Sequence, residues 1–316
     1  SMMVEGTLMR QVALVPCAFG HPGSRISPRL LAAGHRVRTL TNHPGPASDI
    51  EVHPYQFHDR DAMIAAMTGA TVLYNTYWVR YAPGGTTYAA AVANTRRMIE
   101  AAVAAGVRRM VHVSITNPSH DSFYEYYRGK AAIEDLVRGS GLSYAIVRPT
   151  VIFGAGDILV NNIAWLVRRF HLFAIPGDGR YRVRPVSVED LADLCVRLGA
   201  DLPDADLPDA DRRGVVVDAV GPETFTFEDL VRTIAAGVGA RCLPVHLPPV
   251  VVVGILRLLA LVTRDVVLTG DEIRGLTAEL VSVDGPATCP TRLTDHLAAH
   301  PGTIGANYHS ELARRR

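Results

Sequence analysis

The pattern that most constrains this chain is a regular alternation of two kinds of segment from Gln11 to about Pro149. Short β-branched and apolar runs, such as 12–15 and 142–149, have the length and composition of buried strands. Between such runs, residues 86–106 are rich in alanine, carry apolar residues at helical spacing and end in glycine, as helices do. Strands and helices in alternation predict a doubly wound parallel sheet, an α/β fold with right-handed crossovers.

The alternation becomes irregular beyond residue 150, which predicts a division of the chain. Residues 8–150 are expected to form the parallel-sheet domain, and residues 151–316 mainly a smaller lobe, with elements such as 215–221 returning to the sheet. At 316 residues, 48% hydrophobic and 20% charged, the chain can bury a large core.

Charge and cysteine usage exclude several classes of function. The formal net charge of +1 gives no overall field that would attract nucleic acid. The four cysteines are scattered without Cys-x-x-Cys spacing, so no metal site is predicted, and a reducing cytoplasm is expected. No signal-peptide pattern follows Ser1.

One apolar run, 248–262, is the only candidate membrane segment in the sequence. It is shorter than the roughly 20 residues that a span needs and contains Arg257, so no membrane span is predicted. We expect a helix of the second lobe here, with contact to a membrane surface as the alternative.

The strongest chemical signal is the spacing of Tyr126 and Lys130 in Tyr-Tyr-Arg-Gly-Lys. Four residues make about one helical turn, so both side chains share a face. An ammonium beside a phenol favours the phenolate and lowers the pKa of the phenol, which lets tyrosine exchange protons with a carbonyl or an alcohol near neutral pH. The same spacing also arises by chance in a chain with 11 tyrosines, so the motif depends on its context.

The context is a strand pattern that starts at Arg109 and ends in hydroxyl residues Ser114 and Thr116. Ligands of open parallel sheets bind at the carboxyl ends of strands. A strand that delivers hydroxyls to this edge, just before a helix with Tyr126 and Lys130, predicts a site at that edge.

Together these segments resemble the short-chain dehydrogenase/reductase superfamily, in its atypical or extended branch (the NAD-dependent epimerase/dehydratase family, NmrA-like). The resemblance runs from about Gln11 to Leu198 and rests on Tyr126-x-x-x-Lys130, on Arg148-Pro149-x-x-x-Phe153-Gly154 and on the segment 186–192. It implies a Rossmann-type domain with a smaller C-terminal substrate lobe. It also implies Tyr126 as acid/base, Lys130 holding the nicotinamide ribose, and Thr116, with Ser114 in reserve, orienting the substrate oxygen. Family members often dimerise through the helices flanking the motif, so a homodimer is one expectation.

The expected phosphate loop departs from the family pattern. Gly20 and Gly23 occupy the second and third glycine positions, whereas Cys17 stands at the first, where a glycine makes a tight turn. Pro22 removes one backbone N–H from the loop. We expect weaker phosphate binding than in the family, with further cofactor-binding residues at Phe19, His21, Asn42, Gln56, Asn75, Lys130 and Pro149.

The nucleotide specificity is open in the sequence. Where an acidic residue would bind the ribose of NAD, the chain has Asn42, and Arg25, Arg36 and Arg38 are near enough to serve the 2′-phosphate of NADP. NADP is weakly favoured over NAD.

The substrate residues are predicted from their places at the sheet edge and in the early second lobe: Tyr77, Trp78, Arg80, Asn161, Asn162, Trp165 and Arg184. Few charges and several aromatics indicate a small, partly apolar substrate.

We therefore expect an NAD(P)-dependent oxidoreductase or epimerase that acts on a carbonyl or secondary alcohol. The alternative is a redox-neutral isomerase, lyase or cyclase that keeps Tyr126 as acid/base with dinucleotide binding weakened or lost. A second alternative is a nucleotide-sensing regulator, which has no use for a proton donor.

Overall fold

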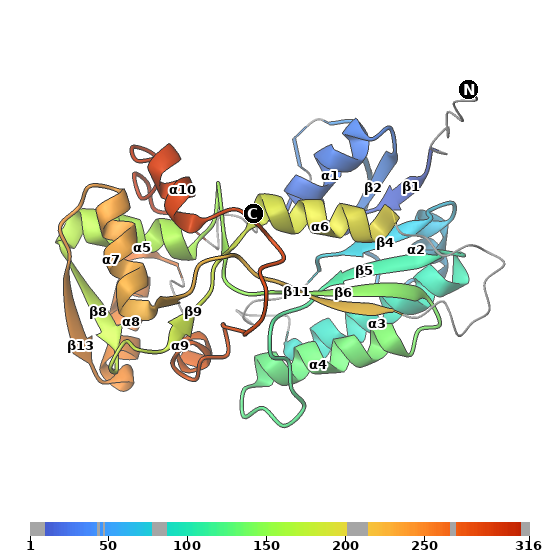
Figure 1. Cartoon of the computed structure of the whole chain (residues 1–316). Helices are drawn as coiled ribbons and strands as arrows, with labels where there is room; N and C mark the ends of the chain where they lie inside the picture. Colours follow the sequence, from blue (N-terminus) through green and yellow to red (C-terminus); the bar gives the residue numbers. More distant parts are fainter. Residues whose placement is uncertain are drawn as a thin grey trace.

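The central element of the computed structural model is a seven-stranded sheet in which every neighbouring pair of strands is parallel (Figure 1). The structure describes residues 10–42, 45–46, 48–77, 87–200, 214–265 and 270–310. The strands lie in the order β11 (Val215–Ala219), β6 (Ser143–Pro149), β5 (Arg109–Val113), β4 (Val72–Asn75), β1 (Val12–Leu14), β2 (Arg36–Leu40) and β3 (Glu51–His53). The order reverses between β1 and β4, as in a doubly wound sheet, so the predicted α/β Rossmann-type fold is confirmed.

Helices cover both faces of this sheet. Figure 1 shows α1 (Gly23–Ala32) and α6 (Val188–Ala200) on one face, where they contact each other. On the other face lie α2 (Arg60–Met67), α3 (Tyr88–Ala104) and α4 (Glu125–Arg138). Each face has its own buried apolar cluster, which explains why the inner strands read as continuous apolar runs.

The second lobe contains the remaining elements and its own core. Three short strand pairs are present: β7 (Ile152–Phe153) with β10 (Val186–Ser187), β8 (Leu172–Pro176) with β13 (Leu243–Leu247), and β9 (Arg182–Val183) with β12 (Phe225–Thr226). The helices are α5 (Leu159–Phe170), α7 (Phe227–Gly237), α8 (Pro249–Thr263), α9 (Gly270–Thr277) and α10 (Leu293–Ala299). Its core lies largely between α5 and α7 and is built around Phe153 and Phe227.

Two elements from beyond residue 150 belong to the parallel sheet rather than to this lobe. Helix α6 packs on α1, and β11 pairs with β6 along its whole length, from Val215 opposite Ala145 to Ala219 opposite Pro149. The chain thus leaves the sheet domain after β6 and returns to it twice.

The parallel register brings four loops to one edge of the sheet. These loops follow β1, β4, β5 and β6 and carry, respectively, Cys17, Thr76 with Tyr77, Ser114 to Thr116, and Thr150; Asn75 is the last residue of β4. The run that starts at Arg109 is strand only as far as Val113, so both hydroxyl residues lie in the loop beyond the strand. Within the described residues, no helix is long and apolar enough to cross a membrane.

Candidate active site at the carboxyl edge

Helix α4 places Tyr126 and Lys130 one turn apart at the edge of the sheet. The Lys130 side chain is buried, with 3% of its surface exposed, whereas Tyr126 is half-buried with its ring 6.0 Å from that of Tyr88. Burial lowers the pKa of Lys130 to about 7, and the negative charge of Glu134 opposes that fall. The ammonium is therefore held in a dry environment in which its charge depends on nearby groups.

Glu134 lies one further turn along α4 and is the acceptor of a buried polar network. Its carboxylate, 1% exposed, accepts hydrogen bonds from the Ser114 hydroxyl at 2.8 Å and from Arg148 Nη2 at 2.8 Å. Arg138 Nη2 also reaches it at 3.2 Å. This network joins α4 to β6 and to the loop after β5. The Ser114 hydroxyl therefore donates its hydrogen bond to a group of the protein itself.

Asn75 and His112 form a second polar pair beneath α4, at opposite positions of β4 and β5. Asn75 Oδ1 accepts the Tyr77 N–H at 3.0 Å, so its amide NH₂ faces His112 Nδ1 at 3.1 Å. Nδ1 is then the acceptor, and the ring proton resides on Nε2. Burial, followed by the charge of Lys130, holds the pKa of His112 well below its usual range. Among the described residues, Nε2 has no hydrogen-bond partner.

Thr116 has the other buried hydroxyl of this region. Its backbone N–H donates to the Pro149 carbonyl at 3.1 Å, which fixes the loop after β5 against the end of β6. Its side chain is buried, and Oγ1 finds no hydrogen-bond partner in the described part of the chain. A buried hydroxyl without a partner costs free energy, and such groups mark positions where a ligand supplies the missing bond.

The loop after β1 makes the tight turn that the family needs, with Cys17 in place of glycine. Cys17 has φ 57°, in the left-handed region, and its carbonyl accepts the Gly20 N–H at 2.8 Å. A Cβ on Gly23 would lie 2.3 Å from that carbonyl oxygen, so only glycine fits where α1 begins. The tight turn before α1 is thus formed with Cys17 in the left-handed region, at the expense of backbone strain.

The Cys17 side chain points into protein rather than toward a substrate. Its sulfur lies 3.6 Å from the Tyr55 hydroxyl, and burial raises the pKa of the thiol. A thiol kept protonated in this way is a poor nucleophile.

Other residues expected at the dinucleotide have partners within the protein. The Phe19 ring lies against Gly45, where a Cβ would approach it to 2.5 Å. His21 Nε2 lies 3.2 Å from the Ala155 carbonyl, and Asn42 Oδ1 accepts the Tyr55 N–H at 2.9 Å. The Gln56 side chain is exposed.

Tyr55, Phe57 and Tyr77 form an aromatic cluster beside Cys17. The rings of Tyr55 and Phe57 stack at 4.7 Å, and Tyr77 lies 5.4 Å from Tyr55. This cluster places Tyr77 against Tyr55 and Phe57, and the Tyr77 hydroxyl also accepts a hydrogen bond from Asn94. Trp78 and Arg80 lie outside the described residues.

The residues expected to bind substrate in the second lobe are tied to its C-terminal segment and loops. Asn161 and Asn162 donate to the carbonyls of Asn307 and His309, and Trp165 packs on Tyr308 with 5.3 Å between rings. The Arg184 guanidinium donates to three backbone carbonyls, those of Gly221, Val283 and Gly285.

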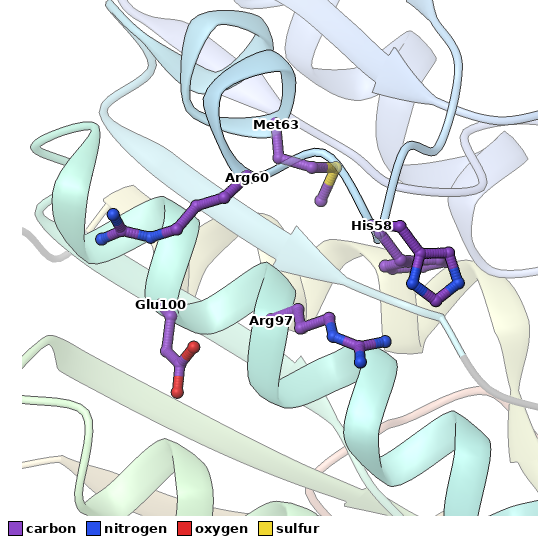
Figure 2. A pocket seen from close by; sticks show the side chains of 6 residues that line it. His58, Arg60, Met63, Arg97 and Glu100 are labelled. Atoms are coloured by element: carbon purple, nitrogen blue, oxygen red, sulfur yellow. The ribbon is translucent and has the colours of Figure 1, made fainter.

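A cavity of about 280 Å³ lies away from this edge, between α2 and α3 (Figure 2). Its lining residues are Phe57, His58, Arg60, Met63, Arg97 and Glu100. Figure 2 shows Arg60 and Arg97 extending to opposite sides, so their guanidinium groups do not converge on one anion. None of the predicted catalytic residues lines this cavity.

Sequence reasoning missed two residues of the site. Glu134 stands four residues after Lys130, so the helical spacing that paired Tyr126 with Lys130 also places it on the same face. His112 interrupts an apolar strand, and a polar residue in a buried strand needs a partner. No group of three or more His, Cys, Asp or Glu that could hold a metal occurs among the described residues.

The comparison with protein families decides the classification. A family model described as NAD(P)H-binding matches residues 18–200, which is more than half of the chain. The chain belongs to this NAD(P)H-binding family. The match begins just after Cys17 and includes Tyr126 and Lys130, so the resemblance to the short-chain dehydrogenase/reductase superfamily is confirmed.

Solved structures of this fold match most of the chain. A triphenylmethane reductase from Citrobacter sp., complexed with NADP(H), is 14% identical, with a TM-score of 0.72 over 92% of this chain and 99% of that one. A nucleoside-diphosphate-sugar epimerase from Staphylococcus aureus is 13% identical, with a TM-score of 0.70 over 91% of this chain and 100% of that one. At such identities the likeness shows the fold.

Curated relatives of this NAD(P)H-binding protein are more similar in sequence but much longer. Subunit 9 of the NADH dehydrogenase [ubiquinone] 1 alpha subcomplex from Arabidopsis thaliana, a mitochondrial protein, is 28% identical over 57% of this chain and 44% of its own length. An uncharacterized Mycobacterium tuberculosis protein is 28% identical over 73% of this chain and 24% of its own length. The chain thus spans less than half the length of either relative.

Proposed function

We propose that this NAD(P)H-binding protein is an oxidoreductase or epimerase that acts on a carbonyl or secondary alcohol of a small, partly apolar metabolite. The observation that carries the proposal is the buried Thr116 hydroxyl, which has no hydrogen-bond partner in the described part of the chain and lies at the same sheet edge as Tyr126 and Lys130 of α4. A hydroxyl, a phenol and a buried ammonium are the groups needed to orient a substrate oxygen and move its proton.

The residues have distinct roles in this proposal. Tyr126 transfers the proton, Lys130 lowers the pKa of the phenol by its charge, and Thr116 orients the oxygen. Ser114 acts through Glu134 as a positioning residue, because its hydroxyl already donates to that carboxylate. Tyr127 is unsuited to the acid/base role, since burial raises the pKa of its phenol to about 12.

The residues present fit a nicotinamide dinucleotide at both ends. The tight turn from Cys17 to Gly23 presents the N-terminus of α1 to a pyrophosphate, and Lys130 would hold the nicotinamide ribose. The bound cofactor supplies a hydride acceptor or donor. The NADP(H) complexed with the reductase neighbour supports such a ligand.

The arginines that favoured NADP in the sequence are engaged in the structure. Arg36 and Arg38 each lie 3.4 Å from Glu51, and Arg25 pairs with Glu189 at 3.1 Å. A 2′-phosphate near Arg36 or Arg38 would compete with the Glu51 carboxylate. We therefore expect a smaller preference for NADP than the arginine count suggests.

The redox-neutral alternative is favoured by one observation, the strained Cys17 backbone in the phosphate loop. Titration of the cofactor-free protein with NADPH and NADH, followed by calorimetry or nicotinamide fluorescence, separates the two proposals. Micromolar binding, about −8 kcal/mol, supports the oxidoreductase. No binding at millimolar cofactor contradicts it and favours proton transfer without nicotinamide.

Catalysis is tested with Tyr126→Phe and the matched control Tyr127→Phe. The first removes the proposed proton donor and should lower turnover by at least about a hundredfold with cofactor binding retained. The second removes a neighbouring phenol and should leave turnover within a few-fold. Equal effects of both would contradict the assignment of Tyr126, and little effect of either would favour a nucleotide-sensing regulator.

A further inference from the structure

Helix α8 belongs to the second lobe (Figure 1), and large apolar side chains on one side of it are exposed. Val250 and Val262 are each 82% exposed and Leu261 is 77% exposed. Together with Val251 and Leu258 they recur at spacings of three, four and seven residues, which is one side of a helix. We call these five residues the α8 face.

The exposure of this face is unusual for such a sequence. Helices that are apolar on all sides are normally buried, yet in α8 only Val252 is buried. The opposite side of the helix packs on β8 and α9. A monomeric soluble protein rarely leaves a contiguous apolar surface of this kind uncovered, so the α8 face marks an interaction surface.

The charge around the α8 face indicates what covers it. From Pro249 to Arg264 the sequence contains no Asp or Glu, but it contains Arg257 and Arg264. Arg257 is exposed beside the α8 face, and Arg264 is exposed at the C-terminal end of the helix. The next acid, Asp265, is buried and accepts the Tyr308 hydroxyl at 3.0 Å.

A second copy of the chain fits this charge distribution poorly. If two α8 faces met across a two-fold axis, the arginines of both copies would come together without an acidic residue from either helix. Anionic lipid supplies the opposite charge around an apolar surface, and apolar helices with basic residues bind at the interface of such membranes.

We propose that the α8 face docks on an anionic lipid bilayer, with α8 lying in the plane of the interface. The five apolar side chains enter the boundary between headgroups and acyl chains, and Arg257 and Arg264 contact lipid phosphates. The helix is about 22 Å long at 1.5 Å per residue, which suits an interfacial helix and is too short for a span. This proposal does not depend on the proposed catalytic function.

The membrane contact would lie close to the candidate site through α9. Helix α8 packs on α9, and in α9 a Cβ on Gly275 would lie 2.7 Å from the Tyr127 hydroxyl. Tyr127 is the neighbour of Tyr126 on α4. Only α9 therefore separates the docking helix from the helix that carries the proposed acid/base.

The test is sedimentation of the full chain with two kinds of vesicle. Neutral vesicles contain phosphatidylcholine alone, and in anionic vesicles about 30% of the lipid is phosphatidylglycerol. We expect binding to the anionic vesicles that weakens with added salt, and little binding to the neutral ones. Leu261→Glu should lower the bound fraction about tenfold or more, because it puts a carboxylate into the apolar contact. Arg257→Glu should lower it several-fold.

Val103→Glu is the matched control, since Val103 is an exposed apolar residue on α3 of the other domain. It should leave vesicle binding unchanged, and thermal melting should show that all variants are folded. No binding to either vesicle at millimolar lipid would overturn the proposal, as would equal binding to both. A concentration-dependent dimer that Leu261→Glu dissociates would also overturn it, by showing that a second copy covers the α8 face.

Discussion

The Ser114 hydroxyl donates to the buried carboxylate of Glu134 at 2.8 Å, whereas Thr116, two residues further along the same loop, keeps a buried hydroxyl without a partner among the described residues. Sequence reasoning placed Thr116 first and Ser114 in reserve, and the two hydroxyls have different surroundings in the structure. The Ser114 hydroxyl belongs to the polar network that holds α4 against the sheet. For the Thr116 hydroxyl, we propose that a ligand oxygen supplies the missing partner.

Thr116→Val should separate function from stability. The change removes a hydroxyl that makes no hydrogen bond, so we expect the free energy of unfolding to stay equal or rise by about 1 kcal/mol, while kcat/KM falls at least about tenfold. Ser114→Ala, the control, leaves Glu134 with one donor fewer and should destabilise the protein by about 1–3 kcal/mol. Denaturant unfolding and steady-state kinetics give both values; full activity of Thr116→Val would contradict its role.

Lys130→Met should make the protein more stable at low pH. The folded-state pKa of Lys130, about 7, lies below that of an unfolded lysine, so the unfolded state binds more protons between about pH 7 and 10.5. The lysine therefore disfavours folding fully below pH 7, and this effect disappears as pH rises through that window. We expect Lys130→Met to raise the free energy of unfolding by about 1–3 kcal/mol at pH 6, and by less at pH 9.

The measurement is urea unfolding at both pH values, with Lys130→Arg as the control that keeps a buried charge. A stability gain for Lys130→Met that did not change between pH 6 and pH 9 would show that Lys130 titrates normally.

Glu134→Gln should move the pH profile of catalysis. The charge of Glu134 raises the pKa of Lys130 against the effect of burial, so its removal lowers that pKa further. The alkaline limb of kcat/KM that reports loss of the Lys130 proton should shift to lower pH by about one unit or more. Arg148 and Arg138 lose a charged partner, so a stability loss of about 2–4 kcal/mol is expected as well.

If Glu134→Gln acted only by destabilising the protein, the pH profile of kcat/KM would not shift. Arg138→Gln is the matched control, because it perturbs the same carboxylate from the half-exposed side without removing its charge. An unchanged alkaline limb in Glu134→Gln would show that Glu134 is only structural.

Cys17→Gly should relieve strain in the phosphate loop. A non-glycine residue at φ 57° costs about 1–3 kcal/mol, of which glycine's larger unfolded-state entropy offsets up to about 1 kcal/mol. We expect thermal stability that is equal or higher by about 1 kcal/mol, and tighter NADPH or NADH binding. Ala18→Gly is the control in the same loop: Ala18 is buried and does not have a positive φ, so it should destabilise. Weaker dinucleotide binding in Cys17→Gly would contradict the loop's role.

The inner strands of the sheet were predictable because they are buried on both faces and read as apolar runs. Residues 142–149 were expected as a strand and β6 covers Ser143–Pro149; residues 86–106 were expected as a helix and α3 covers Tyr88–Ala104. These features depend on neighbouring residues along the chain, so they can be predicted from one sequence.

The contacts of the site residues could not be predicted from the sequence, because they join segments that are far apart along the chain. Arg184 was expected to meet a substrate anion, but the carbonyls that surround it come from residues 221, 283 and 285. The Asp190 carboxylate likewise accepts the N–H and the hydroxyl of Thr291, 101 positions further along. No periodicity in the sequence reports such long-range pairings.

The return of β11 to the sheet has a consequence for synthesis of the chain. A ribosome releases the first six strands of the sheet well before Val215–Ala219, so the backbone of β6 remains an open edge while the intervening residues of the second lobe emerge. Open edges of this kind invite pairing with other chains. The nascent protein is therefore most exposed to aggregation during translation of that insertion, and a fragment that stops after Pro149 would keep the exposed edge permanently.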